Sequence, residues 1–162
     1  TEQGATQILL WGAIGIGFKK LIVVDVSRLT RESYRSSILQ PSVGALKAAT
    51  RCGGEFMQDN ARPHRGGMEY LRSRGVRCLA EQWPASSCDL NCIETLWSHL
   101  QYEVSRRGPY GKAELIDFTK KCWDDIPQQK IDTLCAGFLN RCEKCVASRG
   151  ECIKPPSRSA LS

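Results

Sequence analysis

Short β-rich runs dominate the first half of this chain, and helical apolar patterns dominate the second half. The segments 6–14 and 21–25 flank the turn-forming sequence GIGFKK, so they predict an antiparallel hairpin. The runs 55–58 and 76–80 predict two further strands, one on each side of a helix over 67–74. A strand, helix, strand order favours parallel pairing. The pattern therefore predicts an α/β fold.

Caps and helix breakers predict the remaining elements of the first half. Thr30 is expected to cap a helix that Pro41 ends or kinks, and a second helical piece follows over 45–49. Gly53 and Gly54 then interrupt the chain before the strand over 55–58.

The second half predicts three helices. Apolar residues recur at helical spacing in the first of them, at Ile93, Leu96, Trp97, Leu100 and Val104. GPYG at 108–111 breaks this helix, and a second is expected over 112–123. Pro127 is expected to open one long last helix that continues to Val146.

The length of 162 residues suits one ordinary domain, which we place at 1–150, with a disordered polar tail at 151–162. No stretch approaches the roughly 20 apolar residues that a membrane span needs, and no secretory signal opens the chain, so we expect an intracellular protein. The chain begins with Thr1 rather than Met, which suggests a piece of a longer polypeptide or an incomplete gene model. Nine cysteines, an odd number without regular paired spacing, favour reduced thiols.

The net charge of +6 is unevenly distributed. Residues 1–81 carry 12 Lys and Arg against 7 Asp and Glu, whereas residues 82–162 carry 11 against 10. A group of arginines follows Asp59 closely, namely Arg62, Arg65, Arg72, Arg74 and Arg77. Such a group is expected either to bind a polyanion or to form an ordinary solvated surface.

Two acidic residues are the candidate site. Asp59 follows the strand over 55–58, at the end where open α/β sheets usually place their sites, and Glu94 falls in the first turn of the helix that begins near residue 93. Two carboxylates that converge from distant parts of a chain can hold a divalent metal for phosphoryl chemistry. Two structural alternatives remain open: Asp59 could form an Asx turn, and Glu94 could complete a capping box with Asn91.

These segments also support a family comparison. QDNARPH at 58–64, followed by WPASSCDLNCIETLW at 83–97, resembles the catalytic domain of Tc/mariner superfamily transposases, whose pattern is a QDNAxxH block and an SPDLNPIENLW-like block. The 34 residues between Asp59 and Glu94 match the branch of that family with a terminal glutamate. WGAI near the start and IPQQKIDTL and RCEKCVASRG near the end are similar in order and spacing, so the resemblance covers nearly the whole chain.

The resemblance implies a ribonuclease H-like mixed sheet flanked by helices, with a helical C-terminal part. It implies a site of three acidic residues around two Mg²⁺ (or Mn²⁺) ions, of which Asp59 and Glu94 match the second and third. The first would lie upstream of Thr1, in a strand that 1–150 lacks, and neither Glu2 nor Asp25 matches its place. The family's helix-turn-helix region is absent as well. We therefore expect residues 1–162 alone to be catalytically impaired.

The function implied is part of a cut-and-paste DNA transposase that performs metal-dependent end cleavage and strand transfer in the nucleus. DNA is the expected partner, a homodimer is a further expectation, and Asn60, Arg62, His64 and Arg65 are the expected nucleic-acid contacts. The alternative is an inactive, domesticated or decayed nucleic-acid-binding module of the same origin. Cys88 and Cys92 stand where the family usually has prolines, which favours a decayed or relaxed copy.

The sequence leaves two alternative roles open for several side chains. His64 could orient a phosphate or water near Asp59, or have no role. Trp97 is expected in the core, whereas Trp83 is undecided between the core and base stacking. Four cysteines suggest a zinc site: Cys135, Cys142, Cys145 and Cys152. The first three fall on one helical face, which instead favours a lining of the core.

Overall fold

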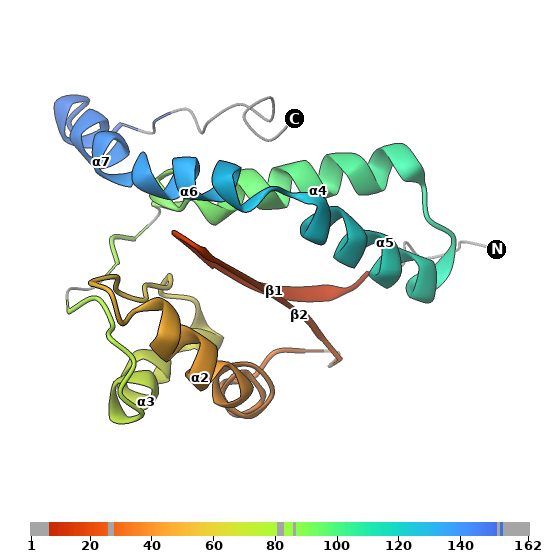
Figure 1. Ribbon diagram of the computed structural model, residues 1–162, viewed down its shortest axis with the longest axis horizontal. Coiled ribbons are helices and arrows are strands. Elements are labelled where there is room, and N and C mark those ends of the chain that lie inside the picture. The colour runs from red at the N-terminus through yellow and green to blue at the C-terminus, as the bar shows by residue number, and fades with distance from the viewer. Residues whose placement is uncertain (1–6, 26–27, 81–82, 86, 152, 154–162) are drawn as a thin grey trace. The chain divides into compact units, whose positions relative to one another are not determined.

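The structure is a computed structural model that describes residues 7–25, 28–80, 83–85, 87–151 and 153. It divides into two compact units (Figure 1). We call Val24–Ser87 the central unit, and residues 1–23 together with 88–162 the hairpin unit. Nearly all of the tail expected at 151–162 lies outside the described residues.

The hairpin unit takes its name from a two-stranded antiparallel sheet of β1, Leu9–Gly15, and β2, Phe18–Val24. The predicted hairpin is therefore confirmed. The turn is shorter than expected, because only Ile16 and Gly17 lie between the strands. Gly17 has φ +67°, a left-handed conformation that a tight two-residue turn requires and that glycine adopts without strain.

Four helices complete this unit: α4, Ile93–Arg107; α5, Gly111–Asp125; α6, Gln128–Ala136; and α7, Phe138–Ala147. A short 3₁₀ turn, η3, covers Cys88–Leu90. The predicted break at GPYG is confirmed, with Gly108 in the left-handed conformation at the end of α4. The single last helix that we predicted to Val146 is wrong, because Gly137 separates α6 from α7 with φ −73° and ψ 0°.

The core of the hairpin unit lies between its sheet and its helices (Figure 1). Ile14 and Leu21 of the strands pack against a cluster from α4, α5 and α6 that includes Leu96, Trp123 and Ile131. Trp97, expected in the core, packs against the same cluster and stacks on Trp123 with ring centroids 5.8 Å apart. The predicted apolar stripe of α4 is thus the face that α4 buries.

Polar contacts fasten the hairpin to its helices. The Gly17 N–H donates to Asp132 Oδ1 at 2.8 Å, and Gln128 Nε2 donates to the same oxygen at 2.8 Å. These hydrogen bonds, first that of Gln128 and then that of Gly17, lower the pKa of Asp132 below its usual range. Lys19 Nζ donates to three carbonyl oxygens at the C-terminal end of α5, which are those of Trp123, Asp124 and Ile126. A lysine there complements the negative end of the helix dipole.

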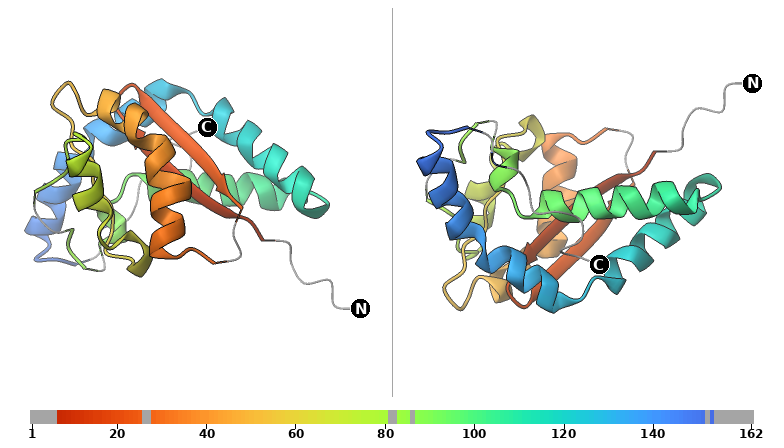
Figure 2. Two further views of the ribbon diagram at one scale, coloured as in Figure 1. Left: turned by 90° about the horizontal axis from the view of Figure 1, so that it is seen from below. Right: turned by 90° about the horizontal axis from the view of Figure 1, so that it is seen from above.

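The central unit begins with a continuous helical run: α1, Arg31–Ser33; the π-helical segment η1, Tyr34–Leu39; and α2, Gln40–Ala49. Thr30 caps it as predicted, with Ser33 closing a capping box. The helix continues past Pro41, so the predicted end there is wrong, whereas the alternative of a kink stays a prediction. Figure 2 shows the helical run from two further sides. Proline lacks an N–H and its ring clashes with the preceding turn, and the wider π-helical turn just before it accommodates both effects.

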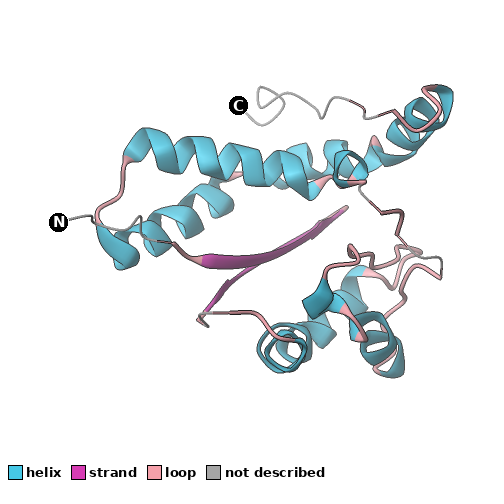
Figure 3. Ribbon diagram, turned by 180° about the vertical axis from the view of Figure 1, so that it is seen from behind, coloured by secondary structure: helices cyan, strands magenta, loops and turns pink. Residues whose placement is uncertain are grey.

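The rest of the central unit holds η2, Arg62–His64, and α3, Gly67–Ser73, where a helix was expected. The strands expected on either side are reduced to one parallel bridge between Phe56 and Cys78 (Figure 3). Phe56 N–H donates to the Arg77 carbonyl at 2.8 Å, and Leu79 N–H donates to the Phe56 carbonyl at 2.9 Å. The parallel order is confirmed, whereas full strands over 55–58 and 76–80 are not formed.

The fold is mixed α/β, as the sequence predicted. Within the described part of the chain, no helix combines the length and the apolar composition needed to cross a membrane.

Candidate functional site

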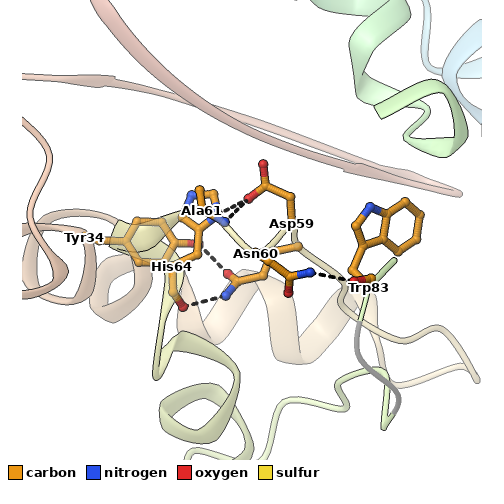
Figure 4. A network of polar contacts seen from close by, with 7 residues as sticks. Tyr34, Asp59, Asn60, Ala61, His64 and Trp83 are labelled. Carbon is orange, nitrogen blue, oxygen red and sulfur yellow. Dashed lines mark hydrogen bonds and ion pairs between the residues drawn. The ribbon is translucent and has the colours of Figure 1, made fainter. Parts of the chain in front are cut away.

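Asp59 lies in the central unit, three residues after the bridged Phe56, and its carboxylate is held by two neighbours (Figure 4). Asp59 Oδ1 accepts a hydrogen bond from the Ala61 N–H at 3.1 Å, which is the Asx turn considered from the sequence. The same oxygen lies 2.5 Å from His64 Nδ1. The side chain of Asp59 is 55% exposed. The turn therefore fixes the carboxylate without hiding it from solvent.

A series of hydrogen bonds supports His64. The Tyr34 hydroxyl donates to Gln58 Oε1 at 2.7 Å, and Gln58 Nε2 donates to the His64 carbonyl at 2.8 Å. The His64 ring also packs on the Tyr34 ring, with centroids 4.6 Å apart (Figure 4). Tyr34 is 1% exposed, so this support is anchored in the core of the unit. Sequence reasoning missed Tyr34 and Gln58, and only the position of Gln58 beside Asp59 could have signalled either.

A surface pocket of about 390 Å³ opens beside this carboxylate. Its lining combines acidic, basic and apolar side chains, among them Asp59, His64, Arg65, Arg72, Leu79 and Trp83. Arg65 and Arg72 are exposed, whereas Trp83 is buried and 7% exposed. Trp83 therefore forms part of the pocket wall. The sequence left Trp83 undecided between the core and base stacking, and its burial favours the core.

The remaining expected nucleic-acid contacts differ in their surroundings. Asn60 Nδ2 donates to the Trp83 carbonyl at 2.6 Å, so its amide fastens two segments of the central unit (Figure 4). Arg62 is exposed at the start of η2 and does not line the pocket. The structure thus brings Asp59, Asn60, His64 and Arg65 together at the pocket, and leaves Arg62 on the surface beside it.

Glu94 lies in the hairpin unit, in the first turn of α4, and is half-buried. The N-cap of α4 is Cys92, which makes no side-chain cap hydrogen bond, and Asn91 Oδ1 accepts a hydrogen bond from the Ile93 N–H at 3.4 Å. A hydrogen bond from the Cys135 side chain and the nearby charge of Arg141 lower the pKa of Cys92 to about 7. The same pairing, together with burial, raises the pKa of Cys135.

Asp59 and Glu94 belong to different units, so the convergence of their carboxylates stays a prediction. Within the described ranges, no three His, Cys, Asp or Glu side chains are gathered in a way that could hold a metal ion. Of the suggested zinc group, Cys135, Cys142 and Cys145 are half-buried, and Cys152 lies outside the described residues.

Comparison with known proteins finds several transposases to which the chain is similar. It is 27% identical over 154 residues to the transposable element Tcb2 transposase of Caenorhabditis briggsae, covering 92% of this chain and 55% of that protein. It is 26% identical over 155 residues to the transposable element Tc3 transposase of Caenorhabditis elegans, covering 93% and 46%. The transposable element Tc1 transposase of Caenorhabditis elegans is 25% identical over 158 residues, covering 94% and 56%.

The chain is thus homologous to Tc1/mariner-family transposases, as the sequence motifs indicated. It spans about half the length of the curated relatives that it matches. No family model matches the chain. No solved structure matches it either.

Proposed function

We propose that this chain is part of the catalytic domain of a cut-and-paste DNA transposase, with a ribonuclease H-like core. The observation that carries the proposal is the Asp59 carboxylate, held by an Asx turn and His64 at the mouth of a pocket with exposed arginines. Homology to Tc1/mariner-family transposases along 92% of the chain supports it. The proposed partner is DNA, the proposed location is the nucleus, and a homodimer is the proposed assembly.

The donor chemistry at Asp59 fits a hard divalent cation. Among the described residues, both hydrogen bonds to this carboxylate use Oδ1, which leaves Oδ2 for another partner. Carboxylate oxygens are the ligands that Mg²⁺ and Mn²⁺ prefer. We propose that Asp59 and Glu94 hold such a cation together. When bound, it would activate a hydroxyl nucleophile and neutralise charge on the phosphate.

DNA is the substrate that the charges around the pocket suit. Arg65 and Arg72 are exposed along its lining, and Arg62, Arg74 and Arg77 are exposed nearby in the same unit. Arginine pairs with phosphate oxygens through two parallel N–H donors. We assign Asn60 and His64 a smaller part in DNA contact than the arginines, because their side chains already bond to Trp83 and Asp59.

The test measures Mn²⁺ binding to the 162-residue chain by electron paramagnetic resonance. Asp59→Asn and Glu94→Gln should each weaken one site by about 10-fold or more, since each removes a charged ligand. The loss in the double variant should differ from the sum of the two single losses, because ligands of one cation are coupled. Glu69→Gln is the matched control, since Glu69 lines the same pocket but is not a proposed ligand. Independent, additive losses would contradict a shared cation.

The second candidate is a DNA-binding module without catalysis, and the exposed arginines also favour it. The two candidates separate in a plasmid-nicking assay with Mg²⁺ or Mn²⁺, performed beside a DNA-binding assay. Salt-dependent binding without Mn²⁺ coordination at Asp59 and Glu94 would support the module. Coordination at both residues would support the transposase domain, even where residues 1–162 alone nick slowly.

A further inference from the structure

Side chains from three helices meet at one point of the hairpin unit. Cys92 is the N-cap of α4, Cys135 is the penultimate residue of α6, and Arg141 lies in the first turns of α7. Arg141 Nη2 donates to Cys92 Sγ and, at 3.1 Å, to the Leu134 carbonyl. Cys92 Sγ in turn donates to the Leu134 carbonyl at 3.6 Å. The residue before Cys135 is therefore tied to both Cys92 and Arg141.

Arg141 is an unusual residue to find at such a point. It is 8% exposed, and its Nε has no hydrogen-bond partner among the described residues. No carboxylate of the described residues forms an ion pair with it. Buried arginines are normally paired, and here the contacts of the guanidinium are a cysteine sulfur and a carbonyl oxygen. Its buried position holds the Cys92 side chain against the end of α6.

The two thiols are direct neighbours. Cys92 Sγ donates to the carbonyl of Leu134, the residue directly before Cys135, and each thiol is close enough to the other to shift its pKa. Both thiols are free and half-buried. A disulfide requires its sulfurs to lie side by side before oxidation, and half-burial leaves a path for a small oxidant. Cys92 at the start of α4 bonds to the residue before Cys135 near the end of α6, so the two thiols are neighbours although different helices carry them.

We propose that Cys92 and Cys135 are a redox modification site, at which a peroxide converts the two thiols into a reversible disulfide. In the first step a Cys92 sulfur attacks one peroxide oxygen, the O–O bond breaks, and a sulfenic acid and one water form. In the second step the Cys135 sulfur attacks the Cys92 sulfur, the S–O bond breaks, and a second water leaves with the thiol proton. Two thiols are oxidised by two electrons, and hydrogen peroxide is reduced to two waters.

The bond would join the start of α4 to the end of α6. It would close a loop from residue 92 to residue 135, which includes all of α5. Glu94 lies in the first turn of α4, so oxidation would also fix the backbone two residues before it. The disulfide itself does not depend on the proposed transposase function, because it concerns only contacts within the hairpin unit.

The test is peptide mapping of the 162-residue chain after treatment with hydrogen peroxide, under non-reducing conditions. Trypsin should release residues 131–141, in which Cys135 is the one cysteine, and residues 78–106, which carry Cys78, Cys88 and Cys92. We expect these two peptides to be linked in most molecules and to separate after dithiothreitol. The midpoint of thermal unfolding should rise on oxidation, since the closed loop restricts the unfolded chain.

Cysteine-to-serine variants identify which sulfurs form the disulfide. Cys88→Ser removes an exposed cysteine of the same peptide, and Cys142→Ser removes a half-buried cysteine near the cluster, so the link should persist in both. It should disappear in Cys92→Ser and in Cys135→Ser. Linkage of Cys135 to Cys88 or Cys142, or an unlinked Cys135 after Cys92 has been oxidised, would overturn the proposal. The wild-type chain and the two control variants test the proposal even if Cys92→Ser or Cys135→Ser fails to fold.

Discussion

At the scale of single residues, Asp59 shows how a structural turn can leave room for the proposed metal-binding role of the same side chain. The sequence left open whether Asp59 forms an Asx turn or binds a metal, and the structure forms the turn with one oxygen only. His64, for which the sequence suggested contact with a phosphate or no role, instead approaches that oxygen at 2.5 Å. Ligands of metals are commonly oriented by such neighbours, and loss of a neighbour weakens metal binding about 10- to 100-fold.

We therefore expect His64→Ala to lower the Mn²⁺ affinity of the chain about 10-fold, because Asp59 loses the neighbour that orients it. His64→Asn should recover part of the affinity, since its amide can donate from a similar position. His99→Ala, on α4, is the control with the other histidine. Titration with Mn²⁺ gives all four affinities, and an unchanged affinity in His64→Ala would refute the positioning role.

Gly12 is a second residue whose importance appears only in the folded chain. A Cβ added there would lie 2.7 Å from the Trp97 ring and 3.0 Å from Ile93 Cδ1. We expect Gly12→Ala to destabilise the chain by about 1–3 kcal/mol, because β1 and α4 would have to separate. Gly15→Ala is the matched control on the same strand, with its nearest contact 3.9 Å away. The two variants should differ in their free energy of unfolding, measured with urea. Equal values would show that the Trp97 and Ile93 side chains move aside for the added methyl group without loss of stability.

At the scale of elements, the sequence predicted the kinds of structure better than their ends. The stripe on α4, the hairpin and the helix after residue 67 form as expected, because each depends on local periodicity or a local cap. Pro41 and Gly137 are where the prediction was wrong. A π-helical turn allows the helix to continue past Pro41. Gly137 separates α6 from α7, although the apolar spacing alone predicted one continuous helix. Both outcomes depend on how the flanking turns are packed.

The link between the hairpin and α6 predicts a dependence on pH. The pKa of Asp132 is lowered by the hydrogen bonds of Gln128 and Gly17, so its charged form is favoured in the folded state. A group with a lowered folded pKa stabilises the fold above its unfolded pKa, about 4, and this contribution is lost as the pH falls through the folded value.

We expect Asp132→Asn to have a lower midpoint of thermal unfolding than the wild type at pH 6, with the difference shrinking below about pH 4. Asparagine keeps an acceptor oxygen, so the comparison isolates the charge. Asp117→Asn, on the exposed side of α5, should follow the wild type throughout. A difference between Asp132→Asn and the wild type that stays constant down to pH 2 would contradict this account.

At the scale of the whole molecule, the excess positive charge in residues 1–81 falls largely within the central unit, where exposed arginines surround the pocket. Arginines of the hairpin unit are in part compensated: Arg106 pairs with Glu103 at 2.7 Å, and Arg107 approaches Glu114 at 3.9 Å. If DNA is the partner, the exposed arginines of the central unit, which form no ion pair with the described carboxylates, should account for most of the phosphate contacts.

We expect the double variant Arg62→Ala with Arg65→Ala to reduce the slope of log affinity against log salt by about 1.8, since each lost phosphate contact reduces it by about 0.9. Arg106→Ala with Arg107→Ala removes the same number of charges from the hairpin unit and should change the slope less. Fluorescence anisotropy with duplex DNA, repeated over a range of salt concentrations, measures both. Equal changes would mean that DNA binding follows total charge and has no preferred face.

The sequence by itself determined the α/β class, the positions of the main helices and the motifs that mark Asp59 and Glu94, because these features depend on periodicity, caps and residues adjacent in the chain. Only the tertiary structure decided what surrounds Asp59, why Trp83 is buried, and which cysteines meet Arg141. Those arrangements join residues 5 to 49 positions apart, through packing and hydrogen bonds that no local pattern encodes. The proposed meeting of the Asp59 and Glu94 carboxylates would be a contact of the same long-range kind, and the Mn²⁺ experiment tests it directly.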